Sequence, residues 1–380
     1  MKIISMEIFP VRIPYVGREQ SSVVDTGGVS NVIVRILAED GHVGYGECGT
    51  ATSTTVMTSA VESMLPFVVG RNPWDREAMV RDILINGRWR YQETTATFAI
   101  AGIDMALWDL CAKIAQVPLY KLFGGALRES VDYFYYLKWD DDDGLVAQCA
   151  DGIKRGYNVY YLKVGLDSQI DEHRLQIVRE AVGPKCKLRI DANQSWTPGE
   201  AFRLIERWHE SFNLDLVEAP IIHHPTSVMR SLKKRITPRI AADEGLRGED
   251  RAYEIVDSGC ADVLCLSVYD LGTLSSLYTL AKQAARLGQS VCKHTWGELG
   301  IFASAMQNIL LTLPLVEEGN QQTAQFLEWD IIEEPLPITT GPKWGRILKP
   351  GLGVTINEER LQKAHKAYLK YGEFPRTRSN

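Results

Sequence analysis

The chain has 380 residues, of which 45% are hydrophobic and 24% charged, and its formal net charge is −6. These proportions are typical of a soluble globular protein, and the negative charge argues against a nucleic-acid-binding surface. The sequence has no run of about eighteen apolar residues, so we expect no membrane span. The length fits a barrel of about 250 residues with an accessory domain.

Residues 1–125 predict an α+β domain with its own core. The N-terminal stretch MKIISMEIFPVRIPY alternates apolar and polar residues, which favours a first strand over a signal peptide. Residues 31–47 predict a β-hairpin that turns at 39–41. The apolar pattern over 95–123 is helical, and Gly124–Gly125 ends it.

Alternation of strands and helices begins at 131–136 and predicts a barrel domain over 126–330. In the clearest helix, Thr197, Pro198 and Glu200 supply an N-cap, a first-turn proline and a capping-box acid. Further helices are predicted at 170–182, 224–235, 249–258 and 272–287.

Residues 331–380 form a C-terminal segment that we expect to return to the N-terminal domain. Its first part is rich in proline and glycine. An amphipathic helix is predicted over 358–371, followed by a basic, frayed tail. The predicted fold class is therefore α/β: a (β/α)8-type, TIM-like barrel with an N-terminal α+β capping domain completed by the C-terminal segment.

Seven scattered cysteines form no CxxC pair. Several lie within apolar runs, so we expect buried free thiols in a reducing, cytoplasmic environment. We expect a homo-oligomer that binds neither membrane nor nucleic acid.

Chemically competent residues end successive apolar runs at intervals of 24 to 28 residues. One strand, one helix and two short loops consume about this length, and a barrel enzyme carries its active site at the C-terminal ends of its strands. The residues in this series are Lys163, Asp191, Glu218, Asp243, Ser267 and His294.

Asp191, Glu218 and Asp243 predict a metal site. Three converging carboxylates repel one another, and a hard divalent cation such as Mg²⁺ relieves that repulsion. Glu244 competes with Asp243, because adjacent residues of a strand point in opposite directions. Each acid alone is more often a helix cap or a surface residue.

Lys163 and His294 are the candidate acid/base groups. Burial beside a dication lowers a lysine pKa toward the value that a general base needs, although a lysine on the barrel rim is the simpler alternative. Lys293 competes with His294. Glu328 ends the predicted eighth strand, where an apolar setting would keep its carboxyl protonated; a structural ion pair is the alternative.

Two segments rich in glycine, serine and threonine, Tyr15–Ser30 and Gly49–Thr58, resemble mobile lids over a small substrate. Within the first segment, Arg18 and Glu19 are candidates for polar substrate contacts. Ordinary surface charge is the simpler interpretation of both.

The motifs LKVG, LRIDANQSW, LVEAP, IAADE and FLEWD resemble, in order and spacing, the enolase superfamily in its mandelate racemase and muconate-lactonizing branch. The resemblance covers essentially the whole chain. It implies removal of the proton α to a carboxylate, which gives an enediolate stabilised by Mg²⁺.

Matched position by position, the resemblance makes Asp191, Glu218 and Asp243 the metal ligands and places Glu244 beside them. Asn193 would lie near the substrate carboxylate, and Lys163 would act as the base. The resemblance also matches His294 to a seventh-strand histidine and Glu328 to an acid that polarises the substrate.

Two positions depart from the family pattern. Tyr161 replaces the first lysine of a Lys-x-Lys signature, and its phenol is a candidate to bind substrate or to act as an acid. Ser267, a candidate substrate contact, replaces the aspartate or lysine of the sixth strand. His294 therefore lacks its usual charged partner and should prefer the neutral state.

Three reactions share this enediolate: racemisation or epimerisation, dehydration, and cycloisomerisation. We favour dehydration of a small hydroxy-carboxylic acid of the sugar type, partly by analogy with the family. The remaining alternative is a non-catalytic binding homologue, since Tyr161 and Ser267 remove charge that the family usually holds.

Overall fold

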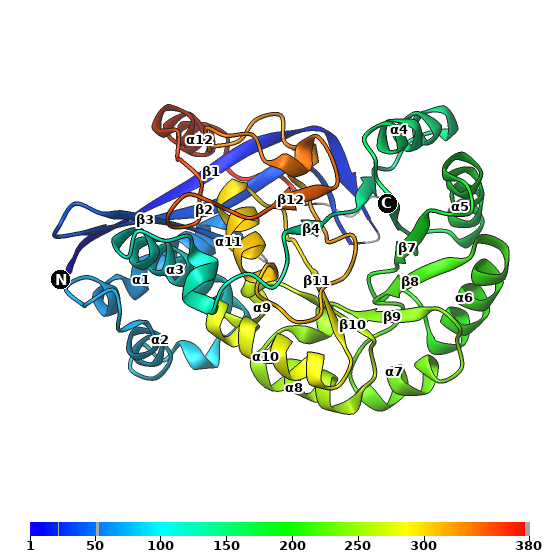
Figure 1. The fold of residues 1–380 in the computed structure, drawn as a ribbon, viewed down its shortest axis with the longest axis horizontal. Coiled ribbons are helices and arrows are strands. Elements are labelled where there is room, and N and C mark those ends of the chain that lie inside the picture. Colours follow the sequence, from blue (N-terminus) through cyan, green and yellow to red (C-terminus); the bar gives the residue numbers. More distant parts are fainter. Residues whose placement is uncertain (22, 51–52, 377–380) are drawn as a thin grey trace.

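The computed structural model describes residues 1–21, 23–50 and 53–376. Figure 1 shows an antiparallel sheet with its helices beside a curled parallel sheet whose outer face is covered by further helices. The protein therefore has an α/β fold.

The N-terminal sheet has three antiparallel strands, β1 (Ile3–Gln20), β2 (Asp25–Ala38) and β3 (Val43–Cys48). The predicted hairpin is confirmed as the β2–β3 pair. Beside it lie α1 (Thr54–Val68), α2 (Arg76–Ile85) and α3 (Glu93–Ile114).

The helix predicted over 95–123 is two elements, because α3 ends at Ile114 and a 3₁₀ helix occupies Leu119–Phe123. Gln116 has φ 56° and Pro118 follows, so the α-helix cannot continue. Among the described residues, α3 is the one helix apolar and long enough to cross a membrane. However, 89% of its apolar window is buried inside the protein, which is typical of a core helix.

Seven parallel strands form the curled sheet, in the spatial order in which they follow along the chain. They are β5 (Tyr135–Leu137), β6 (Val159–Lys163), β7 (Lys187–Asp191), β8 (Leu214–Glu218), β9 (Arg239–Ala242), β10 (Val263–Leu266) and β11 (Ser290–Lys293). Residues 316–320 continue this order, because Val316 bridges Val291 of β11 and Asn320 bridges Tyr133, just before β5.

The helices after these strands are α4 (Asp142–Lys154), α5 (Ser168–Val182), α6 (Pro198–Phe212), α7 (Thr226–Lys233), α8 (Glu249–Ser258), α9 (Val268–Leu271), α10 (Leu274–Arg286) and α11 (Gly300–Leu310). The predicted capping box of α6 is confirmed: the Thr197 side chain accepts from the Glu200 N–H, and the Glu200 carboxylate accepts from the Thr197 N–H. Trp208 of α6 is buried against the sheet. Pro225 delays the start of α7 to Thr226.

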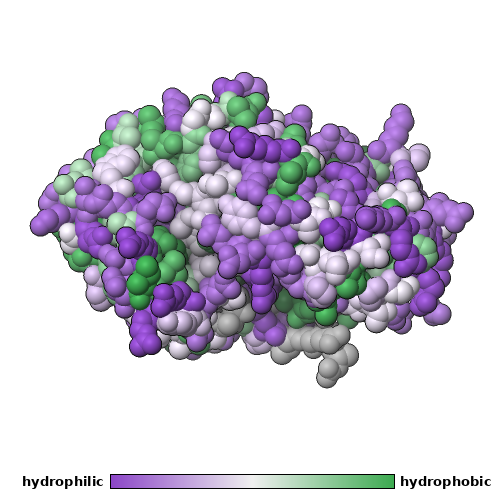
Figure 2. All heavy atoms as spheres, turned by 90° about the horizontal axis from the view of Figure 1, so that it is seen from below, coloured by the Kyte–Doolittle hydropathy of each residue, from purple (hydrophilic) through white to green (hydrophobic). Residues whose placement is uncertain are grey.

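The C-terminal segment crosses back over the molecule. Within it, β12 (Lys343–Gly345) pairs with β4 (Ser130–Asp132), and α12 (Glu358–Tyr371) packs against β1, as Figure 1 shows. The face in Figure 2 is mainly hydrophilic, and its hydrophobic side chains form separate small patches, as on many water-exposed protein surfaces.

Candidate active site

Buried acids meet at the carboxyl edge of the parallel sheet. Asp191 and Glu218 are the last residues of β7 and β8 and are paired in register, while Asp243 directly follows β9. All three are at most 3% exposed. Parallel strands in register bring their carboxyl ends to one edge, which explains why residues so far apart in sequence meet.

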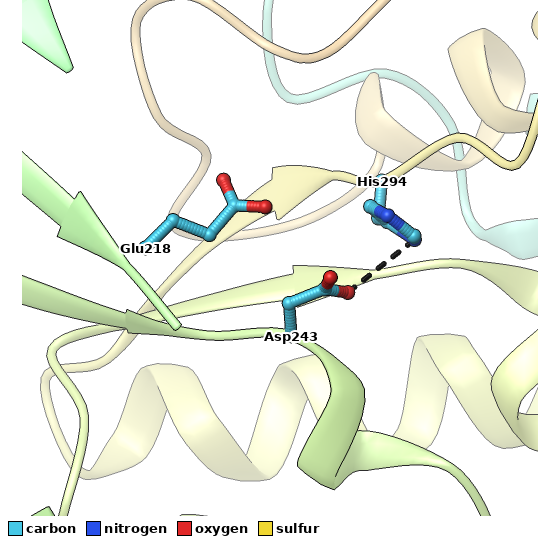
Figure 3. Close-up of side chains that lie close together, drawn as sticks. All are labelled: Glu218, Asp243 and His294. Carbon is cyan, nitrogen blue, oxygen red and sulfur yellow. Dashed lines mark ion pairs between the residues drawn. The ribbon is translucent and has the colours of Figure 1, made fainter. Parts of the chain in front are cut away.

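Glu218, Asp243 and His294 point toward one another in Figure 3. Each offers a possible ligand atom, and these atoms lie within 4.8 Å of one another. Burial, followed by the neighbouring carboxylates, raises the pKa of Glu218 and of Asp243 well above the ordinary values. Such a buried group of acids, with little positive charge beside it, fits a hard cation.

Asp191 lies beside this cluster but has other partners. Its Oδ2 accepts from the Tyr161 hydroxyl at 2.7 Å and from Lys163, and its Oδ1 accepts from the Asn193 N–H at 2.8 Å. Tyr161 also lies 3.4 Å from Glu218 Oε1, so the two carboxylates are adjacent.

Lys163 ends β6 and is directly ion-paired with Asp191. Burial lowers the pKa of its ammonium. The charges of Asp191 and Glu218 and the phenol of Tyr136 outweigh burial and hold that pKa well above the ordinary value. The metal-free protein therefore carries Lys163 in its charged form.

His294 follows β11, with Nδ1 3.4 Å from Asp243 Oδ1 (Figure 3). Burial, and then the positive charges of Lys163 and Arg247, lower the pKa of its imidazole well below 6.5. The imidazole is thus neutral at neutral pH, and its approach to Asp243 is not a charged pair. Lys293, the alternative candidate, pairs with the buried Glu298 instead.

Asn193 and Glu244 lie next to the acids. The Asn193 Nδ2 donates to Asp191 Oδ2 and to Glu244 Oε1, both at 3.1 Å. Asn193 Oδ1 and Glu244 Oε2 are buried without a hydrogen-bond partner among the described residues. Asn193 thereby couples two acids from different strands.

Tyr161 does not face the substrate space as we expected. Its ring stacks on Phe134 at 4.4 Å between centroids, and its hydroxyl donates to Asp191. Burial and then the charges of Asp191 and Glu218 raise its pKa well above 10. Where the family pattern has the first lysine of the Lys-x-Lys signature, this protein has a neutral phenol that donates a hydrogen bond to Asp191.

Ser267 also differs from the prediction of a substrate contact. It is fully buried and caps α9, where its hydroxyl accepts from the Tyr269 N–H at 3.2 Å. The side chain is used by the local turn, since a serine at this position satisfies an otherwise unpaired helix donor.

The predicted placement of Glu328 is wrong. It follows a short 3₁₀ helix, Ala324–Phe326, its side chain is exposed, and its N–H donates to the Pro14 carbonyl. It lines a separate cavity of about 550 Å³ among residues of the C-terminal segment. The apolar run before it resembles a strand, but the chain there has already left the parallel sheet.

Lys163, Asn193, Asp243, Glu244 and His294 line one cavity of about 340 Å³. The tip of the β1–β2 hairpin forms its outer wall, so the first predicted lid segment does border the site. In the second segment, Thr54–Thr58 begin α1, and residues 51–52 lie outside the described residues.

The sequence interpretation missed three side chains of this cavity, Arg247, Trp296 and Arg376, and it named Glu19 as a candidate substrate contact but preferred surface charge. Glu19 looked like surface charge, yet the hairpin carries it over the sheet. Arg376 lies in the tail that we expected to be frayed. The only signal for its docking was Phe374, an aromatic residue in an otherwise polar tail.

Two family descriptions match most of the chain. Residues 4–124 match the mandelate racemase / muconate lactonizing enzyme N-terminal domain, and residues 144–360 match the enolase C-terminal domain-like family.

Relatives match over nearly their full length. The N-succinyl-L-Arg/Lys racemase of Bacillus cereus is 26% identical over 371 residues, covering 95% of this chain and 97% of the relative. Its crystal structure aligns with a TM-score of 0.88 at 24% identity, over 96% of this chain and 98% of that chain.

The D-galactarolactone cycloisomerase of Agrobacterium fabrum is 28% identical over 352 residues, or 87% of this chain and 90% of the relative. Epimerases and a dehydratase are further relatives. This chain is an enzyme of the enolase superfamily, in the branch of mandelate racemase and the muconate-lactonizing enzymes.

Proposed function

We propose that this enzyme removes the proton α to the carboxylate of a small acid, with Mg²⁺ bound by Asp191, Glu218 and Asp243. The observation that carries the proposal is that Lys163 and His294 line the same cavity as Asp243. We assign His294 to proton transfer because Mg²⁺ prefers oxygen ligands.

When bound, Mg²⁺ supplies positive charge that stabilises the enediolate. A cation bound by Asp191 and Glu218 would offset the negative charges that hold the pKa of Lys163 high, and this would favour the neutral amine. The neutral Lys163 Nζ would then accept the α-proton while the electron pair of the C–H bond moves into the substrate carboxylate. Asn193, whose Nδ2 is bound to Asp191 and Glu244 and whose Oδ1 has no partner among the described residues, orients the substrate. The buried walls keep water away from the carbanionic state.

We infer that the reaction is dehydration of a hydroxy-carboxylic acid. His294 approaches the cavity from another strand than Lys163. It would take up a proton from solvent when the anionic substrate offsets the charges of Lys163 and Arg247, and deliver this proton to the β-hydroxyl, which leaves as water. A racemase or epimerase is the second candidate, because two proton-transfer groups in one cavity also allow reprotonation from the other side. Cycloisomerisation remains the third. A racemase that used a lysine on the sixth strand as its second base is excluded, because Ser267 occupies that position.

The test is a library of carboxylic acids incubated with enzyme and Mg²⁺ in D₂O, analysed for deuterium at the α-carbon and for product mass. A dehydratase yields products lighter by one water, a racemase yields deuterated acid of unchanged connectivity, and a cycloisomerase yields an isomer. Mg²⁺ binding without exchange into any acid would instead support a non-catalytic binding homologue.

The variant His294→Asn distinguishes the first two reactions. A racemase variant keeps α-exchange in one enantiomer and loses it in the other, whereas a dehydratase variant exchanges without eliminating. If product formation by His294→Asn equals that of the wild type, the assignment of His294 is wrong.

The same proposal includes the closed barrel, the cellular location and the oligomeric state. We infer a closed (β/α)8-type barrel in which residues 316–320 serve as the eighth strand, supported by their bridges to β11 and to Tyr133. A cytoplasmic location is supported by the cysteines, all of which are free thiols. A homo-oligomer stays a prediction.

A further inference from the structure

Two guanidinium groups line the cavity without a carboxylate partner. Arg247 and Arg376 both border it, and within the described residues neither has an acid within ion-pair distance, although their charges lower the pKa of the more distant Asp270 and Glu19. Nearby, Arg18 is paired with Asp25 at 2.6 Å. An unpaired guanidinium facing a partly closed cavity is unusual, since a buried charge is normally compensated.

Arg247 is fixed by its surroundings. Its guanidinium carbon lies 4.2 Å from the centroid of the Trp296 ring, and its Nε is buried without a hydrogen-bond partner in the described part of the chain. Stacking on an aromatic ring holds a guanidinium in one plane and leaves its edge free for hydrogen bonds.

Arg376 is held in the cavity by a docked tail, which corrects the expectation of a frayed end. The Arg12 guanidinium donates to the carbonyl of Tyr371 at 3.0 Å and lies 3.8 Å from the Phe374 ring centroid. The Phe374 N–H donates to Ser30 Oγ at 3.0 Å.

Gly28 makes room for this tail. A Cβ at Gly28 would lie 2.4 Å from the Phe374 ring and 2.5 Å from the Ile13 carbonyl oxygen, closer than side chains approach one another. Arg376 itself donates to the Thr50 carbonyl. The position of its charge is therefore built into the fold.

Among the described residues, the acid on the hairpin forms no ion pair with these arginines. Glu19 lies with Oε1 3.4 Å from the Tyr136 hydroxyl. Burial raises its pKa, and the charges of Lys163 and then of Arg376 oppose this rise. The positive charges of Arg247 and Arg376 thus stay available to a ligand.

We propose that the substrate is a small dicarboxylate: one carboxylate binds at the metal, and the second binds to Arg247 and Arg376. This inference rests on the proposed function, which supplies the first binding point. The guanidinium fork matches the two oxygens of a carboxylate. A cavity of about 340 Å³ is near the lower limit for small-molecule sites and admits a short chain only.

The test compares sugar diacids (aldarates) with the mono-acids (aldonates) of the same carbon chain and configuration, and with their ω-phosphates. The enzyme with Mg²⁺ is assayed in D₂O for kcat/KM, and binding is measured by calorimetry on the inactive Lys163→Ala variant. We expect the wild type to prefer diacids over mono-acids by about 10- to 100-fold in both measurements.

The variants Arg376→Gln and Arg247→Gln should each lower the ratio of kcat/KM for the diacid to kcat/KM for the mono-acid by about 10-fold or more, mainly through KM for the diacid. Arg376→Lys should recover part of the loss. Arg18→Gln is the matched control, because this arginine is already paired and 54% exposed, and it should keep the wild-type ratio.

Equal values for diacid and mono-acid in the wild type, or an unchanged ratio in both arginine variants, would overturn the inference. Preference for the ω-phosphate would also overturn it, since the second group would then be a phosphate. Failure of the proposed function differs: no acid exchanges deuterium, while calorimetry still records the diacid preference.

Discussion

The two edges of the parallel sheet carry similar amounts of charge but arrange it differently. At the amino edge, Arg189 binds Asp215 at 2.9 Å and Glu317 at 2.8 Å, and Arg239 binds the same two acids. At the carboxyl edge, Lys163 is paired with Asp191 and Lys293 with Glu298, but within the described residues Glu218 and Asp243 have no lysine or arginine within ion-pair distance.

The difference between the two edges also appears in the pKa values of Glu317 and Glu218. Burial raises the pKa of Glu317, but Arg239 and Arg189 outweigh burial and lower it overall. At Glu218, burial and then Asp191 raise the pKa, and Lys163 does not compensate. The amino edge is therefore an ion-pair network whose charges compensate one another and stabilise the sheet. The carboxyl edge holds negative charge that is not fully compensated, as in a site that binds a cation.

The largest expected effect concerns catalysis at the carboxyl edge. The variant Lys163→Ala should lose α-proton exchange by about 10²- to 10⁴-fold, because it removes the group that takes the proton. Exchange is measured by NMR in D₂O with Mg²⁺. Lys138→Ala is the matched control: it follows β5, donates to the Val16 carbonyl and lies outside the cavity. Retained exchange in Lys163→Ala would remove Lys163 as the base.

Next in size is the contrast between two Glu→Gln variants without metal. Glu317→Gln should lower the free energy of unfolding by about 3 kcal/mol, since it leaves Arg189 and Arg239 undercompensated. Glu218→Gln should raise it by about 1 kcal/mol, because it removes one of several repelling buried charges. Denaturant unfolding measures both. Equal destabilisation by the two variants would contradict the difference between the edges.

Added Mg²⁺ should stabilise the wild type by about 2.7 kcal/mol when its concentration is a hundredfold above the Kd. The gain should persist in Glu317→Gln and disappear in Glu218→Gln, because only the latter lies at the predicted metal site. Thermal melts with and without Mg²⁺ test this. A shift of the same size in Glu218→Gln would place the metal elsewhere.

The last prediction concerns pH and Glu47, which joins the N-terminal sheet to α11 by accepting from the N–H groups of Leu299 and Phe302 at 2.9 Å. Burial outweighs these hydrogen bonds and raises its pKa from 4.5 to about 8. Between these values the folded state holds a proton that the unfolded state releases, so stability falls as pH rises.

Denaturant unfolding between about pH 5 and pH 8 measures this slope. The variant Glu47→Gln, which has no proton to release, should show a flatter slope than the wild type. An identical slope in the two proteins would mean that other buried acids dominate the pH dependence.

The sequence predicted the positions that depend on local pattern. Lys163, Asp191, Glu218 and Asp243 were located correctly at strand ends, because an apolar strand followed by a polar residue is a local signal. The capping box at Thr197 was visible for the same reason.

The errors arose where tertiary contacts decide. The segment 316–320, which bridges β11 and Tyr133, has the sequence VEEGN, and its Glu317 belongs to the amino-edge network, so it lacks the apolar pattern of a strand. The apolar run before Glu328 was taken for that strand. Glu19 and Arg376 reach the cavity only because the hairpin and the tail cross the sheet, which no local pattern records.

The docking of the tail by Arg12 and Phe374 depends on the order in which the ribosome synthesises the chain. The hairpin that borders the cavity is made first, the proton-transfer groups follow in the middle, and Arg376 emerges only after all of them. Domains can fold while synthesis continues, so the sheet can form its acidic edge early. If Arg376 binds the second carboxylate as proposed, that binding site is complete only once residue 376 has left the exit tunnel and the tail has reached Ser30.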